Sequence, residues 1–355
     1  MDQKAAILQK ALELGYVRAG VASADDFPEY FQDVTSRPDY EFLMHDKRQI
    51  VQNTHLQERY PGAKSIISVV YSYSGIHYPE KLLPYIGRAY LGRCYGPPVT
   101  NINGARLQLL KDYIKSLGIR IYEEAVLPDR SVGRRAGTIT YGRNNFAYAG
   151  RYGSFIILSS IVTDADLAPD KPIRFNGCPE GCRLCLDACP TQAIAEPFHL
   201  HPQRCVGFNN WFRQDEKGVS PVIPEEIRPA IGMHFHGCDI CQEVCPRNKA
   251  ALENMKVHGR KDPLLEMIAE KFDPEKLLFL DDDYYRETVQ PIMFNYIHDY
   301  RYFRRNAALV MGNSGDPKYL PALHRAEKTE EDEMVREMIA WAIGRLDVAA
   351  PQISA

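Results

Sequence analysis

The spacing of the cysteines constrains this chain more than any other feature. Eight of its nine cysteines fall in one window, residues 178–245. The window holds a run with the spacing C-x3-C-x2-C-x3-C-P, a second run with C-x2-C-x3-C-P, and the single Cys205 between them. Because the chain is long and shows no secretory signal, this spacing favours thiolate ligands of a metal centre over disulfides.

The ends of the two runs indicate which metal centre they hold. Both runs end in Cys-Pro, at Cys189 and Cys245, as the cysteine runs of bacterial ferredoxins do. Closely spaced cysteines wrap one cubane cluster, while the last cysteine, turned away by the proline, reaches the other. We therefore predict two 4Fe–4S clusters rather than two structural zinc sites. The predicted ligands are Cys178, Cys182, Cys185 and Cys245 for one cluster, and Cys189, Cys205, Cys238 and Cys241 for the other.

Two irregularities bear on this ligand assignment. The first gap holds three residues where ferredoxin runs usually have two. Four histidines lie near enough in sequence to replace a cysteine, although solvated or supporting roles suit them better. They are His199, His201, His234 and His236. Cys94 stands outside the set, and we interpret it as a small buried residue, with a role near a ligand as the alternative.

The composition is that of a globular protein with two or three domains. The chain has 355 residues, 45% of them hydrophobic and 25% charged, enough to bury a substantial core. No apolar run approaches the ~18 residues of a membrane span, and the first residues form an amphipathic pattern without a signal-peptide core. We therefore expect a soluble, cytoplasmic protein that is monomeric and has no membrane partner.

The net charge gives no general attraction to nucleic acid. It is formally −3, so a nucleic-acid contact would need a local basic patch. Two groups of arginines are candidates, with ordinary solvated faces as the alternative. They are Arg301, Arg304 and Arg305, and Arg134, Arg135 and Arg143.

The pattern of apolar residues predicts an α+β fold with three consecutive domains. Strand-like runs at 65–73, 119–126 and 154–162 alternate with helical patterns at 4–14 and 103–117, which indicates an α/β domain over residues 1–168. The ferredoxin-like double-cluster module would follow at 169–260. Residues 261–355, with helices expected at 263–272 and 274–279 and paired amphipathic helices after them, resemble a small all-α HEAT-like domain.

The size of the α/β domain indicates that the electrons are used for a reaction within this chain. Two adjacent clusters make a two-step path for single electrons, and a carrier alone would not need the extra domain. Loops at 88–98, 123–130 and 136–146 combine glycine or proline with charged or aromatic residues, which suits loops that approach a ligand. Neither a G-x-G-x-x-G after a strand nor a P-loop is present, so no nucleotide-phosphate site is indicated.

The chain resembles the epoxyqueuosine reductases over most of its length. The matching motifs are L-G-R at 91–93, A-G…G-R-N at 136–144, G-S-F at 153–155, T-D at 163–164, C-P-T-Q-A-I at 189–194, R-C at 204–205, G-C-D-I-C-Q-E-V-C-P-R-N at 237–248 and R-N-A…G-N at 305–313. Members of this family are cobalamin-dependent oxidoreductases of queuosine biosynthesis, a branch of tRNA processing. They reduce the epoxide of epoxyqueuosine in tRNA, using two 4Fe–4S clusters. The resemblance implies a corrinoid-binding N-terminal domain, a tRNA partner and an electron donor such as ferredoxin or flavodoxin.

The resemblance also assigns site residues by position. The family's proton donor, an aspartate in D-S/T-A-P-x-x-E-K/R, falls on Glu123, and the later E-K/R falls on Asp129 and Arg130. A glutamate can serve if desolvation raises its pKa, whereas the alternative is an exposed carboxylate at a strand end. The residues that the resemblance places beside the corrinoid are Arg93, Tyr95, Arg143, Asn144, Ala147, Leu158 and Gly207.

This sequence departs from the family pattern at three places near the expected site. The family's R-D-Y-H is Arg93-Cys94-Tyr95-Gly96, its L-G-W is Thr138-Ile139-Thr140, and a serine beside the corrinoid is Gly207. The leading interpretation is a reductase in which the clusters deliver electrons to Co(I) corrinoid, which attacks an epoxide-like carbon, with Glu123 as the acid. The alternatives are a diverged relative that deoxygenates or dehalogenates a small molecule, and a non-catalytic electron-transfer or corrinoid-activating protein.

Overall fold

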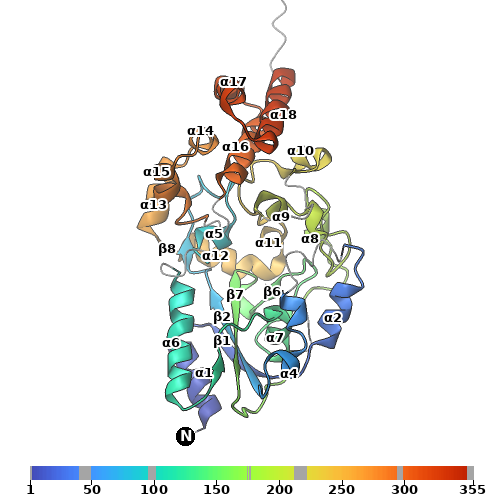
Figure 1. Cartoon of the computed structure of the whole chain (residues 1–355), viewed down its shortest axis with the longest axis vertical. Helices are drawn as coiled ribbons and strands as arrows, with labels where there is room; N and C mark the ends of the chain where they lie inside the picture. The colour runs from blue at the N-terminus through green and yellow to red at the C-terminus, as the bar shows by residue number, and fades with distance from the viewer. Residues whose placement is uncertain are drawn as a thin grey trace, which may run out of the picture. The chain divides into compact units, whose positions relative to one another are not determined.

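The computed structural model describes residues 2–39, 49–94, 101–173, 175, 177–211, 222–293 and 299–349 (Figure 1). The chain divides into two units, each built from stretches that are far apart in sequence. Unit 1 comprises Met1–Ser74, Pro98–Cys182 and Pro246–Glu253, and unit 2 comprises Gly75–Pro97, Arg183–Cys245 and Asn254–Ala355. This differs from the expected consecutive domains 1–168, 169–260 and 261–355, because distant segments pack into the same unit.

A four-stranded antiparallel sheet organises unit 1. Its order is β1-β2-β7-β4, with β1 at Arg18–Ser23, β2 at Ser65–Ser72, β4 at Ile121–Tyr122 and β7 at Ile156–Thr163. The predicted strands at 65–73 and 154–162 therefore exist, and the one at 119–126 shortens to two residues. Side chains alternate between the two faces along each strand, so both faces need a covering layer.

Helices supply that layer on both faces of the sheet (Figure 1). Helices α1 (Gln3–Glu13) and α6 (Ile102–Ser116) cover one face, and α4 (Leu56–Arg59) and α7 (Asp129–Arg135) cover the other. The first face buries the odd-numbered Val21, Ile67, Val69 and Ile161. The second buries the even-numbered Ala22, Ile66 and Val162. Burying each Val or Ile contributes about 1.5–3 kcal/mol, so the period of two in the sequence fixes this arrangement.

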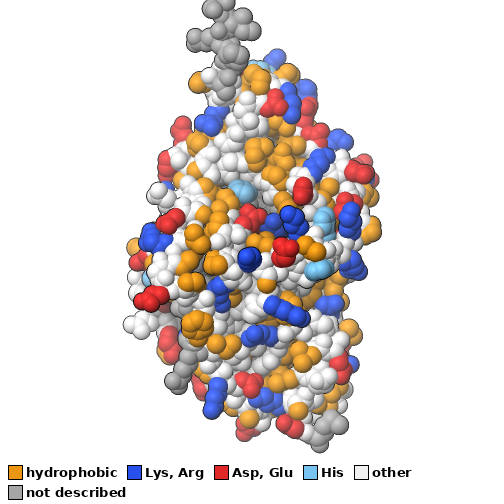
Figure 2. Space-filling model, turned by 180° about the vertical axis from the view of Figure 1, so that it is seen from behind, with side chains coloured by type: hydrophobic (Ala, Val, Ile, Leu, Met, Phe, Trp, Pro, Cys, Tyr) orange, Lys and Arg blue, Asp and Glu red, His pale blue; other side chains and the backbone are white. Residues whose placement is uncertain are grey.

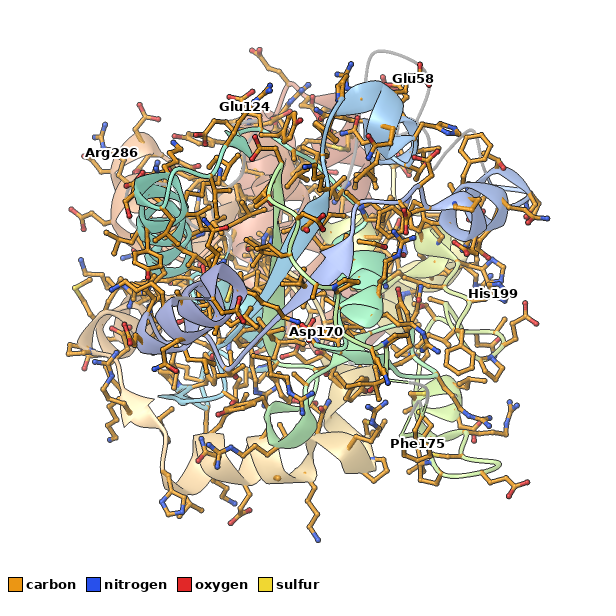
Figure 3. The ribbon with its side chains drawn as sticks, turned by 90° about the horizontal axis from the view of Figure 1, so that it is seen from below. Glu58, Glu124, Asp170, Phe175, His199 and Arg286 are labelled. Carbon is orange, nitrogen blue, oxygen red and sulfur yellow. The ribbon has the colours of Figure 1, made fainter. Side chains whose placement is uncertain are left out.

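Two polar side chains tie distant segments to this sheet. Asp170 accepts hydrogen bonds from Lys4 Nζ (2.6 Å) and from the backbone N–H of Val21 (2.9 Å), and Figure 3 shows it beside α1 and β1. Asn248 accepts from the backbone N–H of Ser154 and donates to its hydroxyl, both at 2.8 Å. Asn248 thereby attaches the short stretch after the last cysteine to the start of β7.

The remaining elements of unit 1 are short, and one helix continues into unit 2. They are α2 (Pro28–Thr35), β5 (Thr140–Tyr141), β6 (Ala147–Tyr148), η1 (Gly150–Tyr152), η4 (Pro246–Asn248) and the shared α12 (Lys249–Val257).

Unit 2 is mainly helical, with one small parallel pair of strands, β3 (Ile76–His77) and β8 (Arg260–Lys261). Its elements before residue 254 are α5 (Arg88–Leu91), α8 (Leu184–Asp187), η2 (Pro202–Arg204), α9 (Val206–Trp211), η3 (Glu225–Ile227), α10 (Arg228–Ile231) and α11 (Ile240–Glu243). The later helices are α13 (Pro263–Lys271), α14 (Pro274–Leu278), α15 (Asp282–Tyr284), η5 (Tyr285–Val289), α16 (Tyr300–Ser314), η6 (Pro317–Tyr319), α17 (Leu320–Thr329) and α18 (Glu333–Ala349). The helices predicted at 263–272 and 274–279 are present as α13 and α14.

Helix α16 fastens the cysteine-rich part of unit 2 to its helical part. Arg305 is fully buried, and its Nη2 donates to the carbonyl of Asn209 at 2.7 Å. Asn306, also fully buried, donates to the carbonyls of Asn210 (2.5 Å) and Phe235 (3.0 Å). Short helices leave many carbonyls without a helical partner, and these side chains supply the missing donors.

Neither group of arginines forms the basic patch considered from the sequence. Arg305 is buried, while Arg301 pairs with Asp299 and Asp332, and Arg304 pairs with Glu330. In the other group, Arg135 donates to the carbonyls of Ser23, Asp25 and Asp26. On the face shown in Figure 2, basic and acidic side chains are interspersed. Arg301, Arg304, Arg305 and Arg135 therefore serve mainly the fold.

The Asn306→Ala substitution should destabilise unit 2 strongly. It removes a donor to the buried carbonyl of Phe235, one of two donors to that of Asn210, and an acceptor of the Arg305 guanidinium, at a cost of about 2 kcal/mol or more. Arg304→Ala, one residue earlier, removes only a partly exposed ion pair and should cost less than about 1 kcal/mol. Thermal unfolding of the cluster-loaded proteins checks this, and equal melting temperatures for the two variants would refute the role given to Asn306.

Candidate iron–sulfur centre and active site

Unit 2 brings together the four cysteines predicted to hold the second cluster. Helices α8, α9 and α11 carry or flank these residues, which are Cys189, Cys205, Cys238 and Cys241. Burial raises the pKa of the Cys241 thiol well above its usual range, and the neighbouring thiols of the set raise it further. Within the described stretches, no three metal-ligating side chains meet at the spacing of a single bound ion. A cubane takes one thiolate at each of its iron atoms, so it needs no common meeting point.

Backbone N–H groups point at three of these sulfurs. Ala193 donates to Cys189 Sγ at 3.2 Å. The N–H groups of Gly207 and Phe208 bond to the Cys205 sulfur, and that of Ile240 to Cys238. Such donors favour the thiolate form that binds iron. Gly207, which the resemblance places beside the corrinoid, thus contacts a cysteine ligand through its backbone.

Charged and aromatic groups hold the helix that carries Cys241. Asp239, just before α11, accepts from the backbone N–H and the guanidinium of Arg88, at 2.8 and 3.0 Å. Arg88 also bonds to Glu243 at 2.6 Å. His236 is buried with its ring centroid 4.3 Å from that of Tyr90, and burial lowers its pKa to about 3. This histidine is therefore neutral.

The four cysteines predicted for the first cluster are divided between the units. Cys178 and Cys182 belong to unit 1, and Cys185 and Cys245 to unit 2. In unit 1, Cys178 Sγ accepts from the backbone N–H of Arg143 at 3.4 Å and lies 3.8 Å from Arg247 Nη1. Donors therefore surround a sulfur of this set too.

Four of the residues expected beside the corrinoid lie in unit 1. Ala147 and Leu158 belong to one apolar cluster with Val70, so the structure brings these two together. Asn144 donates to the hydroxyl of Tyr148 at 2.9 Å. Arg143 Nε is buried, and the part of the chain that the structure describes offers it no hydrogen-bond partner. A polar ligand at this position would satisfy that donor.

On the side of β7 away from β2, the described residues place no strand beside Leu158. Residues 157–160 are half-buried, and β4 pairs with Val162 and Thr163. An unpaired strand edge offers backbone N–H and C=O groups to a bound molecule. A corrinoid carries amide groups around its rim, so this edge and the buried Arg143 Nε fit such a ligand.

The remaining expected corrinoid residues belong to unit 2 or lie outside the described residues. Arg93 has a left-handed backbone (φ +54°) and its Nη2 pairs with Asp262 at 2.5 Å. Tyr95 lies outside the described residues. Cys94 is buried, and burial raises the pKa of its thiol, as the simple packing interpretation expects.

The three residues that replace the family's L-G-W all have structural partners in unit 1. Thr138 Oγ1 lies 3.0 Å from the hydroxyl of Ser68, and Ile139 is fully buried. Thr140 Oγ1 accepts from Arg247 Nη2 at 2.5 Å. These three residues therefore take part in the packing of α7, the sheet and the segment that follows the last cysteine.

The surroundings of Glu123 differ from those expected of a proton donor. It is exposed, just after β4, and pairs with Lys111 and Lys115 on α6. The bond from Lys115 holds its pKa below the usual range, not above it. Burial is too slight to offset the two lysines, so in this conformation Glu123 is a carboxylate.

Asp129 has the protonation properties that were expected of Glu123. It is half-buried at the start of α7, and its Oδ1 accepts from the Ser160 hydroxyl at 2.6 Å. Burial raises its pKa to about 6. The only sequence signal was its alignment with the glutamate of the family's E-K/R pair, because burial by β7 depends on residues distant in the chain.

Comparison with known proteins decides the family. Residues 178–248 match a family described as a 4Fe-4S double cluster binding domain, and residues 292–353 match HEAT repeats. The epoxyqueuosine reductase of Bacillus cereus is 29% identical over 94% of this chain and 86% of its own length. The chain belongs to the epoxyqueuosine reductase family.

Two solved epoxyqueuosine reductases share the fold across nearly the whole chain. The enzyme from Bacillus subtilis, solved with its catalytic aspartate loop swung out of the active site, is 26% identical with a TM-score of 0.75, covering 97% of this chain and 98% of that one. Another, solved with an epoxyqueuosine-modified tRNA stem loop, is 24% identical with a TM-score of 0.71, again covering 97% and 98%. The α+β fold class, the double-cluster module and the HEAT-like end are confirmed. None of the described helices is long and apolar enough to cross a membrane.

Asp129→Asn should change how the stability of this epoxyqueuosine reductase family member depends on pH. The folded-state pKa of about 6 exceeds the unfolded value of about 4. The stabilisation from this group is therefore full below about pH 4 and lost as the pH rises through about 6. The melting temperature of the variant, relative to wild type, should rise between about pH 4 and 6 and then level off.

The matched control is Ser160→Ala. The Ser160 hydroxyl lowers the pKa of Asp129, so its removal should move the same step to higher pH. A difference between Asp129→Asn and wild type that stays constant with pH would show that Asp129 titrates normally.

Proposed function

We propose that this chain is a cobalamin- and iron–sulfur-dependent reductase that acts on epoxyqueuosine in tRNA. The observation that carries the proposal is the convergence of four partly buried cysteines in a chain of this family, within a region that matches a double-cluster domain. The Bacillus cereus relative, an epoxyqueuosine reductase, supports the reaction. The reducing environment that thiolate ligands need supports a cytoplasmic location.

The cysteines of the chain take the two cluster-binding roles in this proposal. The first set contains three closely spaced cysteines and one distant cysteine, whereas the second contains one close pair and two distant cysteines. The first set is Cys178, Cys182, Cys185 and Cys245, and the second is Cys189, Cys205, Cys238 and Cys241. Their backbone N–H donors stabilise thiolates that would otherwise stay protonated when buried. The protein acts as a monomer and receives electrons from a ferredoxin or flavodoxin.

The corrinoid-binding residues in this proposal are those that the family resemblance assigns. They are Arg93, Tyr95, Arg143, Asn144, Ala147, Leu158 and Gly207. When bound, the corrinoid supplies an electron-rich cobalt able to attack a strained carbon. The protein holds the ligand by backbone groups at the open edge of β7 and excludes water with the apolar cluster around Ala147 and Leu158.

The proton for the leaving oxygen comes from a carboxyl group of unit 1. Glu123 occupies the family position of the acid, and the Bacillus subtilis relative has been solved with its catalytic loop swung out. A similar movement here would break the pairs with Lys111 and Lys115 and let desolvation raise the pKa of Glu123. Asp129 is the second candidate, because its pKa already lies near neutrality.

Two matched variants separate these candidates. Glu123→Gln should retain iron and corrinoid but lose about 100-fold or more in the reduction of epoxyqueuosine-containing tRNA, since one general acid contributes about 10²–10⁴-fold. Asp129→Asn should keep most of the activity if Glu123 is the acid. The reverse pattern would transfer the role to Asp129, and full activity in both variants would remove both from the mechanism.

The substrate is tested with the wild-type protein. Turnover of epoxyqueuosine-containing tRNA supports the proposal. Corrinoid binding without turnover would favour a relative that deoxygenates or dehalogenates a small molecule, which the replacement of L-G-W by Thr138, Ile139 and Thr140 makes a real alternative. Absence of corrinoid binding would leave an electron-transfer protein.

A further inference from the structure

We propose that Arg247 raises the reduction potential of the first cluster by acting on Cys178. This rests on the proposed ligand set, in which Cys178 binds that cluster. Arg247 follows the last cysteine by two residues and lies in unit 1 with Cys178. Its Nη1 is 3.8 Å from Cys178 Sγ, within the reach of an N–H···S contact.

The guanidinium of Arg247 is fixed in position by three groups. Its Nη1 donates to the carbonyl of Tyr141 at 2.9 Å, and its Nη2 donates to Thr140 Oγ1 at 2.5 Å. Its Cζ lies 3.9 Å from the centroid of the Tyr148 ring, a cation–π contact. An arginine with this many partners keeps its charge in one place, unlike a freely moving surface side chain.

The backbone just before Cys178 is shaped to admit this guanidinium. Gly177 has a left-handed φ of +75°, and a Cβ added there would lie 3.0 Å from Cζ, Nε and Nη2 of Arg247. The charged plane therefore packs directly against the peptide that leads into the cysteine. The backbone N–H of Arg143 reaches the same sulfur at 3.4 Å, so one ligand receives two N–H donors and a positive charge.

These groups act on the charge of the cluster. One-electron reduction makes a cluster with thiolate ligands one unit more negative, and a nearby cation and N–H donors stabilise the more negative state. Groups that surround metal ligands tune the metal in this way without binding it. Arg247 is thus a tuning residue that makes the first cluster easier to reduce than it would be without this charge.

The test measures the midpoint potentials of both clusters in the loaded protein. The redox titration is followed by electron paramagnetic resonance. In Arg247→Met, the midpoint potential of one cluster should become more negative by about 59 mV, which is about a tenfold change in its reduction equilibrium. Arg247→Lys keeps the charge and should shift it less. The exposed Lys249, two residues later, provides the control Lys249→Met, which should leave both potentials unchanged.

Iron content separates the failure of this proposal from the failure of the ligand set. Cys178→Ala should remove the iron of one cluster, and full iron content in that variant would refute the ligand set. If Arg247→Met impairs cluster assembly, Thr140→Val removes a single anchor of the guanidinium and should give a smaller negative shift. Unchanged potentials with full iron content in Arg247→Met would refute the tuning role. If that variant does not assemble its clusters, unchanged potentials with full iron content in both Arg247→Lys and Thr140→Val would refute it.

Discussion

Four thiols gathered in an apolar region are the constraint on which unit 2 depends. Burial raises the pKa of Cys205, Cys238 and Cys241, and the like charges of neighbouring thiolates would raise it further. A bound metal centre lets four thiolates coexist in such a place, because it supplies positive charge. The short helices α8, α9 and α11 carry or flank these cysteines.

Short helices also leave backbone carbonyls without partners, and side chains from distant segments supply the missing hydrogen bonds. A helix of four to six residues leaves most of its carbonyls without an internal partner. Arg305 and Asn306 on α16 supply donors to carbonyls at Asn209, Asn210 and Phe235. In unit 1, Asn248 joins distant segments in another way, by accepting from the backbone N–H of Ser154 and donating to its hydroxyl. The HEAT-like helices therefore do more than form the end of the chain, because α16 also stabilises the cysteine-rich part of unit 2.

The parts of this structure that local patterns determine could be predicted from the sequence. Runs rich in β-branched and other apolar residues predicted β2 and β7, and cysteine spacing predicted the double-cluster module. The interleaving of the two units could not be predicted, because it depends on pairings such as Asn248 with Ser154 across the chain. The surroundings of Glu123 and Asp129 were missed for the same reason. Lysines on α6 keep Glu123 ionised, and β7 buries Asp129.

One departure from the family pattern lies close to a predicted ligand of the first cluster. Thr140 stands where the family has tryptophan, and its hydroxyl accepts from Arg247, whose other amino group lies near Cys178. If Cys178 binds that cluster, as we propose, a change at Thr140 bears on the electron supply and need not imply a new substrate. For Glu123, the ion pairs with the lysines of α6 must break before its carboxyl group can serve as the proposed acid.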